Sequence, residues 1–283
     1  MVRAGGPPAC GGERSDRRIG TGGREPLTER SARVVAAAKL LRHVGRKRSG
    51  LFLAEGPNLL GAALARGLVT DVFATEVALD RFDDLLGSTS VHLVTDKAAK
   101  VLSDTVTPVG LVGVCTMPEA SLTDVLDTSP RLLLVAVETS EPGNAGTLIR
   151  IADAMGADAV VLAGESVDPF NGKCLRASAG SIFALPVLSA PDAPALVAAL
   201  RSGGLRVLAT TLDGELSLDS PELQAELSTP TAWLFGAEAH GLAADVAALA
   251  EARVRIPMPG SAESLNIAAA AAICLYQSAR ANR

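Results

Sequence analysis

The chain has 283 residues, of which 48% are hydrophobic and only 3% aromatic, so it can form roughly two domains with cores of mainly Ala, Val and Leu. No run of about 18 apolar residues escapes interruption by a charge, Pro or Gly, and the N-terminus lacks the apolar segment of a signal peptide, which predicts a soluble cytoplasmic protein without a membrane span. Residues 1–50 carry 12 Lys and Arg against 4 Asp and Glu, whereas the other residues carry 14 Lys and Arg against 27 Asp and Glu. The acidic remainder excludes charge-driven coating of nucleic acid by the whole protein, so a nucleic-acid contact is expected only at the basic end.

The first part of the chain predicts a tail and a small domain. Residues 1–30 are rich in Gly, Arg, Pro and Ser, which is typical of a disordered tail. A helical pattern begins at Ser31, and a helix is expected through residues 59–64. Short apolar runs predict strands at 51–54, 69–74, 91–94 and 111–114. We therefore expect an α/β domain over 31–117, followed by a linker or short helix over 118–130.

The second part, 131–283, alternates strands and helices more regularly. The pattern predicts strands at 132–137, 159–162, 205–210, 232–235 and 254–256 and helices at 146–155, 173–178, 193–202, 243–249 and 264–281. This alternation favours a mostly parallel sheet covered on both faces. Ligands of such sheets bind at the C-terminal ends of the strands, so the loops that follow the strands are the candidate binding site.

The loop after the first of these strands bends sharply at Pro142 and leads into a helix that Asn144 can cap. Arg150 follows within two turns, close to the positive end of the helix, where an Arg is unfavourable unless it binds an anion. The alternative is a surface Arg paired with Asp153 or Glu141.

The loop 236–242 has glycines at both ends, which lets the backbone approach a ligand closely, and Glu238 lies between them. His240 could serve as a general base, but nothing nearby would orient it, so a solvated histidine is the favoured interpretation.

The third loop follows a short strand that Pro257 and Pro259 terminate. Ser264 is the expected N-cap of an Ala-rich helix, so free backbone N–H groups would face a ligand. The alternative is an ordinary strand–loop–helix corner. The sequence contains no GxGxxG after a strand and no GxxxxGK[ST], HExxH or GxSxG, which disfavours a hydride carrier or an ATPase. Four scattered cysteines, without a CxxC pair, predict reduced thiols and no metal site.

Four segments in order resemble the SpoU (TrmH) branch of the SPOUT RNA methyltransferases. They are 141–156, the Arg-Ala-Ser-x-Gly element within 173–181, then 234–242 and 256–266. The resemblance extends over 31–283, and the segment 39–60 is similar to an L30e-like substrate-recognition domain. Ala239 and Ala268 depart from the family pattern, in which Gly and Ser are common at these positions.

The resemblance implies a trefoil knot in the C-terminal sheet, S-adenosyl-L-methionine as the cofactor, no metal, and a homodimer with its active site near the interface. It also implies methyl transfer to a ribose 2′-OH, with large-subunit (23S) ribosomal RNA as the favoured substrate. The alternatives are tRNA and a non-catalytic RNA-binding protein on the same fold.

The resemblance also implies the residues of the site. The catalytic candidates are Asn144, Arg150, Glu238, Ser264 and Asn266. The cofactor candidates are Thr210, Thr211, Leu234, Phe235, Gly236, Ala237, Gly241, Ile256, Met258, Ser264, Leu265 and Ala268. The RNA-binding candidates are Lys39, Arg42, Arg46, Lys47, Arg48 and Arg176. A guanidinium is a poor proton acceptor at neutral pH, so we expect Arg150 to position the substrate and stabilise charge, with the two asparagines orienting the ribose and the Arg150 side chain.

Overall fold

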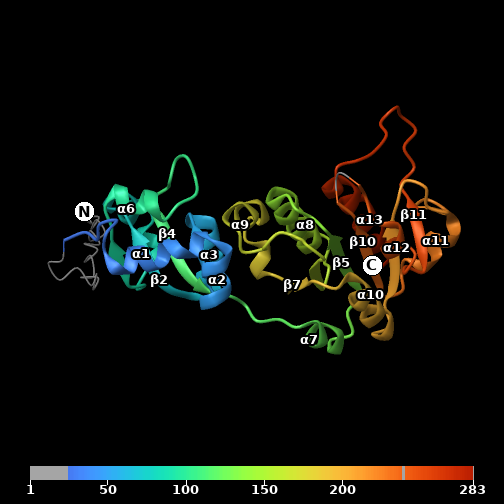
Figure 1. Ribbon diagram of the computed structural model, residues 1–283, viewed down its shortest axis with the longest axis horizontal. Helices are drawn as coiled ribbons and strands as arrows, with labels where there is room; N and C mark the ends of the chain where they lie inside the picture. Colours follow the sequence, from blue (N-terminus) through green and yellow to red (C-terminus); the bar gives the residue numbers. More distant parts are fainter. Residues whose placement is uncertain (1–24, 238–239, 283) are drawn as a thin grey trace, which may run out of the picture.

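A computed structural model describes residues 25–237 and 240–282, which form two α/β domains side by side, joined by a segment that carries α7 (Leu122–Asp127) (Figure 1). Each domain has its own β-sheet, as the two alternating parts of the sequence predicted. Among the described residues, no helix is long and apolar enough to cross a lipid bilayer.

The first domain, called the recognition domain below, has a four-stranded mixed sheet in the order β1-β4-β2-β3. Its strands are β1 (Leu51–Glu55), β2 (Val69–Ala74), β3 (Val91–Leu93) and β4 (Leu111–Thr116). Its helices are α1 (Ala32–Ala38), the 3-10 turn η1 (Lys39–Leu41), α2 (His43–Ser49), α3 (Pro57–Ala65), α4 (Glu76–Arg81), α5 (Asp83–Leu86) and α6 (Asp96–Val101). Alternate residues of β2 enter separate cores on the two faces, Phe73 towards α1 and α6, and Val72 towards α3 and α4.

Two features of this domain differ from the sequence-based predictions. The expected tail reached residue 30, but residues 25–30 are ordered, because the Leu27 amide donates to the Leu93 carbonyl at 2.8 Å and the Thr95 amide donates to the Leu27 carbonyl at 3.0 Å. The rest of the predicted tail lies outside the described residues. Helices α2, α4, α5 and α6 were not expected, because they are short, and α2 carries three cations and buries only Arg46.

The second domain, called the catalytic-type domain below, has a seven-stranded sheet in the order β7-β6-β5-β10-β8-β11-β9, and its strand pairs are parallel. Its strands are β5 (Leu132–Val137), β6 (Ala159–Ala163), β7 (Val187–Ala190), β8 (Arg206–Thr210), β9 (Leu216–Ser217), β10 (Thr231–Phe235) and β11 (Ala252–Arg255). Its helices are α8 (Pro142–Ala154), α9 (Gly172–Ser178), the 3-10 turn η2 (Ser181–Phe183), α10 (Ala193–Ser202), α11 (Pro221–Glu226), α12 (Ala244–Ala247) and α13 (Ile267–Ala281).

Both faces of this sheet are covered, as predicted. In β5, Leu134 and Ala136 face the core under α8, α9 and α13, whereas Leu133 and Val135 face the core under α10 and α12. A strand buried on both sides needs an uninterrupted apolar run, and β5 consists entirely of Leu, Val and Ala. The trefoil knot stays a prediction.

The helices next to the predicted site begin at other residues than expected. Helix α8 begins at Pro142, and its N-cap is Glu141, whose side chain accepts from the Gly143 amide, so Asn144 lies inside the first turn instead of capping it. Proline is favoured at this first position because its fixed φ suits a helix and it has no N–H to satisfy. Helix α13 begins at Ile267, with Asn266 as its N-cap instead of the expected Ser264.

The sequence reading also missed β7, β9 and α11 and made the helix at α12 too long. These elements have two to six residues, too few for a hydrophobic period to distinguish them from loops.

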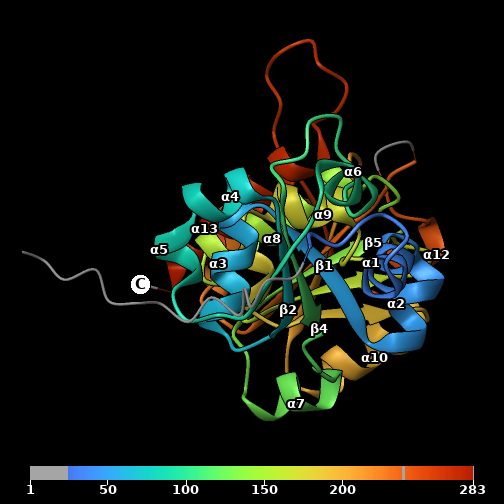
Figure 2. The ribbon, with the colours of Figure 1, turned by 90° about the vertical axis from the view of Figure 1, so that its left-hand side faces the viewer.

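The two domains share a hydrophobic contact. Phe52 of β1 packs against Phe170 and Phe183, with ring centroids 5.0 and 5.8 Å apart, respectively, and its side chain belongs to the larger core of the catalytic-type domain. The end-on view in Figure 2 shows β1 of the recognition domain in front of the second domain.

Candidate functional site

The C-terminal ends of β5, β8, β10 and β11 meet at one edge of the sheet. Phe235, the last residue of β10, pairs with Ala136 of β5, and Val254 of β11 pairs with Thr210 of β8. The strands are parallel, so the three loops singled out in the sequence all leave from this edge. The topology therefore gathers segments that lie more than one hundred residues apart in the chain.

Two of the candidate catalytic residues, Asn144 and Asn266, approach each other across the site. The Asn266 Nδ2 atom lies 3.5 Å from Asn144 Oδ1, at the outer limit of a hydrogen bond. Asn266 Oδ1 also accepts from the Ala268 amide at 2.8 Å, which caps α13. The first turns of α8 and α13 thus converge, and each presents the positive end of its helix dipole.

Arg150 lies exposed on α8, six residues after Asn144. That spacing corresponds to about 9 Å along the helix and about 120° around it, so Arg150 and the asparagine pair are on different faces. Within the described part of the chain, Arg150 makes no ion pair. The alternative partner Glu141 is instead paired with Lys173.

Glu141 is held in its charged form. The hydrogen bond from Lys173 is the main cause that lowers the pKa of its carboxyl group, and the Gly143 amide adds to it. An ionised carboxylate at the N-terminus of α8 interacts favourably with the helix dipole.

The loop after β10 folds tightly back on itself. The Gly241 amide donates to the Ala237 carbonyl at 2.8 Å. A Cβ atom on Gly236 would lie 2.1 Å from the backbone of Gly241 and Leu242, so this turn requires glycine. Glu238, the remaining catalytic candidate of this loop, lies outside the described residues.

The cofactor candidates next to this loop offer backbone groups and one unsatisfied hydroxyl. The side chains of Leu234 and Phe235 are buried in the core, so only their backbones can meet a ligand. Thr210 Oγ1 donates to the Leu234 carbonyl at 2.9 Å, whereas Thr211 Oγ1 is buried and has no hydrogen-bond partner among the described residues. A buried orphan hydroxyl is costly unless a ligand satisfies it, so these residues fit a polar cofactor at the strand ends.

The loop between β11 and α13 stands out from the body of the domain (Figure 1). Ile256 and Met258 near its start are half-buried, whereas Ser264 and Leu265 are exposed. Ala268 is buried at the start of α13. The structure therefore ties down both ends of the loop and does not enclose Ser264 or Leu265 in a pocket wall.

The RNA-binding candidates divide into two groups. Four are exposed around η1 and α2, namely Lys39, Arg42, Lys47 and Arg48. Arg46, in contrast, is 3% exposed and pairs with Asp168, and Arg176 pairs with Asp104 and Glu55. The guanidinium groups of Arg46 and Arg176 thus join the two domains. The burial of Arg46 argues against a direct contact with RNA, whereas Arg176 is 34% exposed and its contact with RNA stays a prediction. No sequence signal predicted Asp168, which lies 122 residues from Arg46.

Across the residues that the structure describes, no group of three or more His, Cys, Asp or Glu is arranged to hold a metal ion.

Each of the two domains matches the model of a known protein family. Residues 131–276 match the model of the SpoU rRNA Methylase family, and residues 32–113 match an MRM3-like substrate binding domain. The chain is 34% identical to the 23S rRNA (guanosine(2553)-2'-O)-methyltransferase RlmP of Bacillus subtilis, over 82% of this chain and 89% of the relative. It is 30% identical to the 23S rRNA (uridine(2479)-2'-O)-methyltransferase of Streptomyces viridochromogenes, over 90% and 91%, respectively.

Among solved structures, the SpoU methyltransferase AviRb from Streptomyces viridochromogenes, in complex with the cofactor AdoMet, is similar with a TM-score of 0.78 and 30% identity. The similarity covers 89% of this chain and 98% of AviRb.

Proposed function

We propose that this chain, which belongs to the SpoU rRNA methylase family, transfers the methyl group of S-adenosylmethionine to a ribose 2′-OH of 23S rRNA. The observation that carries the proposal is the convergence of Asn144 and Asn266 at the strand ends, because it joins the first and last motifs of the resemblance at one point. The relatives methylate guanosine or uridine, so the shared chemistry is that of the ribose and not of the base. A tRNA substrate is the second candidate from the sequence, and the relatives described above favour rRNA.

The reaction requires the ribose oxygen to approach in line with the bond that breaks, so positioning dominates the catalysis. Asn144 and Asn266 carry amide groups that can hold a ribose hydroxyl through donors and acceptors. Arg150 is exposed, carries a permanent charge and lies on another face of α8 from the asparagines, so it binds a neighbouring RNA phosphate and thereby positions the ribose. Glu238 and Ser264 hold the surrounding loops and the substrate.

The cofactor, when bound, supplies the activated methyl group. The Thr211 hydroxyl and the backbone of the Gly236 loop would hold its polar groups, with Thr210 fixing the end of β8. Ile256 and Met258, with Leu265 after loop closure, would line its apolar side.

RNA contacts the recognition domain through the exposed cations of η1 and α2. Arg42, Lys47 and Arg48 extend into solvent and can each neutralise a backbone phosphate. An enzyme that modifies bacterial-type rRNA works where ribosomes are assembled, so the proposed function implies a cytoplasmic protein.

A homodimer is supported by the outer face of α13. Ala269, Ile273 and Tyr276 follow one another at helical spacing and are exposed, with Ile273 at 37% and Tyr276 at 47%. Such an apolar stripe, next to the site at Asn266, is suited to the same face of a second copy.

The proposal is tested by mapping 2′-O-methylation in total RNA from cells with and without the gene. One 23S rRNA ribose should lose its methyl group in the deletion strain, whereas a loss confined to tRNA would replace the substrate proposed here. In vitro, Arg150→Ala should lower kcat at least about 100-fold while calorimetry still detects S-adenosylmethionine binding. Unchanged turnover would remove Arg150 from the mechanism, and a well-folded wild-type protein that does not bind the cofactor would rule out the enzyme.

A further inference from the structure

We propose that Asp168 and Arg176 are positioning residues that lock the recognition domain onto the helix pair of the active site and thereby set which RNA nucleotide reaches it. The inference rests on the proposed function, and it assigns a role to interdomain charges that the reaction itself does not use.

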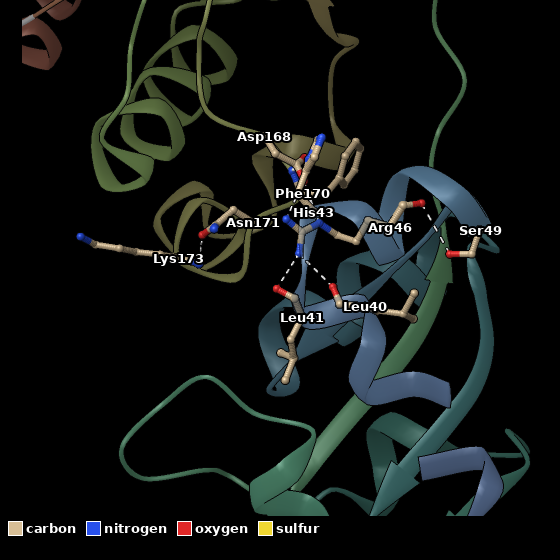
Figure 3. A network of polar contacts seen from close by, with 9 residues as sticks. All are labelled: Leu40, Leu41, His43, Arg46, Ser49, Asp168, Phe170, Asn171 and Lys173. Atoms are coloured by element: carbon tan, nitrogen blue, oxygen red, sulfur yellow. Dashed lines mark hydrogen bonds and ion pairs between the residues drawn. The ribbon is translucent and has the colours of Figure 1, made fainter. Parts of the chain in front are cut away.

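The first lock centres on Asp168, which precedes α9 (Figure 3). Its Oδ2 atom accepts from Arg46 Nε at 2.7 Å, lies 2.6 Å from Arg46 Nη2 and lies 2.9 Å from His43 Nδ1. Arg46 Nη1 donates to the carbonyl groups of Leu40 and Leu41 at 2.8 and 3.0 Å, respectively. The backbone of the recognition domain thus fixes the orientation of the Arg46 guanidinium group, which is then in position to pair with the Asp168 carboxylate of the other domain.

Asp168 is prepared as an anion. Burial would raise the pKa of its carboxyl group, but hydrogen bonds from His43, the Phe170 amide and Arg46 outweigh burial and lower it. The Phe170 amide donates to Asp168 Oδ1 at 2.9 Å, which holds the carboxylate in place from within its own domain.

The second lock has the opposite polarity. Arg176 of α9 pairs with Asp104 of the recognition domain, and Glu55 lies 3.7 Å from the same nitrogen. The Glu55 carboxylate is 9% exposed and accepts hydrogen bonds from Ser103 and Thr105. One lock therefore places its cation in the recognition domain and the other places it in the catalytic-type domain, so a rotated arrangement would bring like charges together.

Both ion pairs involve α9 or the residues just before it, because Asp168 precedes α9 and Arg176 belongs to it. Helix α9 is in turn tightly packed against α8. A Cβ atom on Gly146 of α8 would lie 2.3 Å from the Cys174 carbonyl oxygen and 2.6 Å from Ala177 Cβ. The position of α2 is thus transmitted through two rigid contacts to the helix that carries Asn144. Because α2 also carries the exposed Lys47 and Arg48, RNA held there has a fixed offset from the site.

Cohesion of the two domains does not require these charges. The contact of Phe52 with Phe170 and Phe183 already buries apolar surface between them. Neither a buried pair such as Arg46–Asp168 nor a partly exposed pair such as Arg176–Asp104 adds much net stability compared with apolar packing, but both discriminate between arrangements. Specifying the orientation of the domains is therefore the role that fits them.

The test compares Asp168→Ala with Glu165→Ala, which removes the same charge three residues away from an exposed side chain without an ion pair in the described structure. The substrate is in vitro transcribed 23S rRNA at saturating S-adenosylmethionine. We expect Asp168→Ala to raise KM for the RNA about tenfold while kcat and the Kd of the cofactor stay within about twofold. Glu165→Ala should match the wild type. Small-angle X-ray scattering of the full chain should show a scattering profile that differs from the wild type for Asp168→Ala alone, because the orientation of the two domains changes.

Emission of Trp233, the only tryptophan, reports whether the catalytic-type domain is folded, because its side chain is fully buried there. An unchanged KM, an unchanged scattering profile, or a parallel loss of cofactor affinity and native Trp233 emission would each overturn the positioning role. If the wild type methylates no rRNA, the proposed function fails, and the scattering comparison still decides whether Asp168 locks the domains.

Discussion

Replacing Gly146 by Ala should force apart the two helices on which the site and the domain contact both depend. The new Cβ atom would lie 2.3 Å from the Cys174 carbonyl oxygen, 2.6 Å from Ala177 Cβ and 3.0 Å from the Ser178 amide nitrogen. Two of these three neighbours are backbone atoms, so no side-chain rotation relieves the contact. Restoring an ordinary separation requires α9 to move by about 1 Å.

The expected cost follows from two opposing effects. Overpacking in a well-packed core destabilises by about 1–3 kcal/mol, whereas exchanging Gly for Ala inside a helix returns at most about 1 kcal/mol. Because the obstacle in α9 is main chain, the overpacking should lie at the upper end, and we expect Gly146→Ala to lower the free energy of unfolding by about 2 kcal/mol. Urea unfolding followed by Trp233 emission measures this in the catalytic-type domain.

The control is Gly143→Ala in the first turn of the same helix. There a Cβ atom would lie 3.4 Å from Glu141 Oε1 and 3.6 Å from Lys173 Cε, which is ordinary contact with flexible side chains. This variant should be as stable as the wild type or more stable by up to about 1 kcal/mol. If Gly146→Ala behaved like the control, α8 and α9 would not be in the tight contact described above.

Three further predictions concern buried polar groups. Ser278→Ala removes the acceptor that lies 2.9 Å from Trp233 Nε1, so a buried donor loses its partner. Urea unfolding should show that the free energy of unfolding falls by about 1–3 kcal/mol. A smaller decrease would mean that another acceptor replaces Ser278. The pKa of Asp168 is lower in the folded protein than in the unfolded chain, so its stabilisation is complete above the ordinary carboxyl pKa of about 4 and is lost as pH falls through the folded value. Acid unfolding of Asp168→Asn should accordingly be less steep than that of the wild type, and identical curves would argue against the pairing. Burial raises the pKa of both Cys115 and Cys174 to about 12. Neither thiol should therefore react with Ellman's reagent in the folded protein at mildly alkaline pH. If peptide mapping found that either cysteine is labelled in the native state, this result would contradict their burial.

The architecture was predictable from the sequence because the strands of both domains are largely apolar segments. β5 and β10, for example, are wholly buried and contain almost no polar residue, and the resemblance placed their loops together. The helix starts were less predictable. Asn144 and Ser264 have the right chemistry for an N-cap, but Pro142 begins α8 earlier and Asn266 begins α13 later. Several residues that can cap occur within each loop, and local sequence does not rank them.

The site was predictable only in part. The meeting of Asn144 and Asn266 follows from parallel strands whose ends share an edge, so sequence order and fold class together imply it. The placement of Arg150 on another face of α8 follows from helical spacing, yet the assignment of an orienting role to the asparagines overlooked it. Asp168 gave no sign of its role, because an Asp before Pro in a loop is an ordinary turn residue.

Arg46 and Lys47 show why counting charges along a sequence overestimates the RNA-binding surface. They are adjacent in α2, and the excess of basic residues in 1–50 treats them alike, but Arg46 is almost fully buried against Asp168 while Lys47 is exposed. Only an exposed cation can release counterions from a phosphate, so under the proposed function we expect Lys47→Ala to reduce the salt dependence of RNA binding and Arg46→Ala not to reduce it directly. Arg46 would act on RNA through geometry instead, by fixing where Lys47 and its exposed neighbours stand. One cation of α2 holds the position of the domain, and the next is the one proposed to hold the substrate.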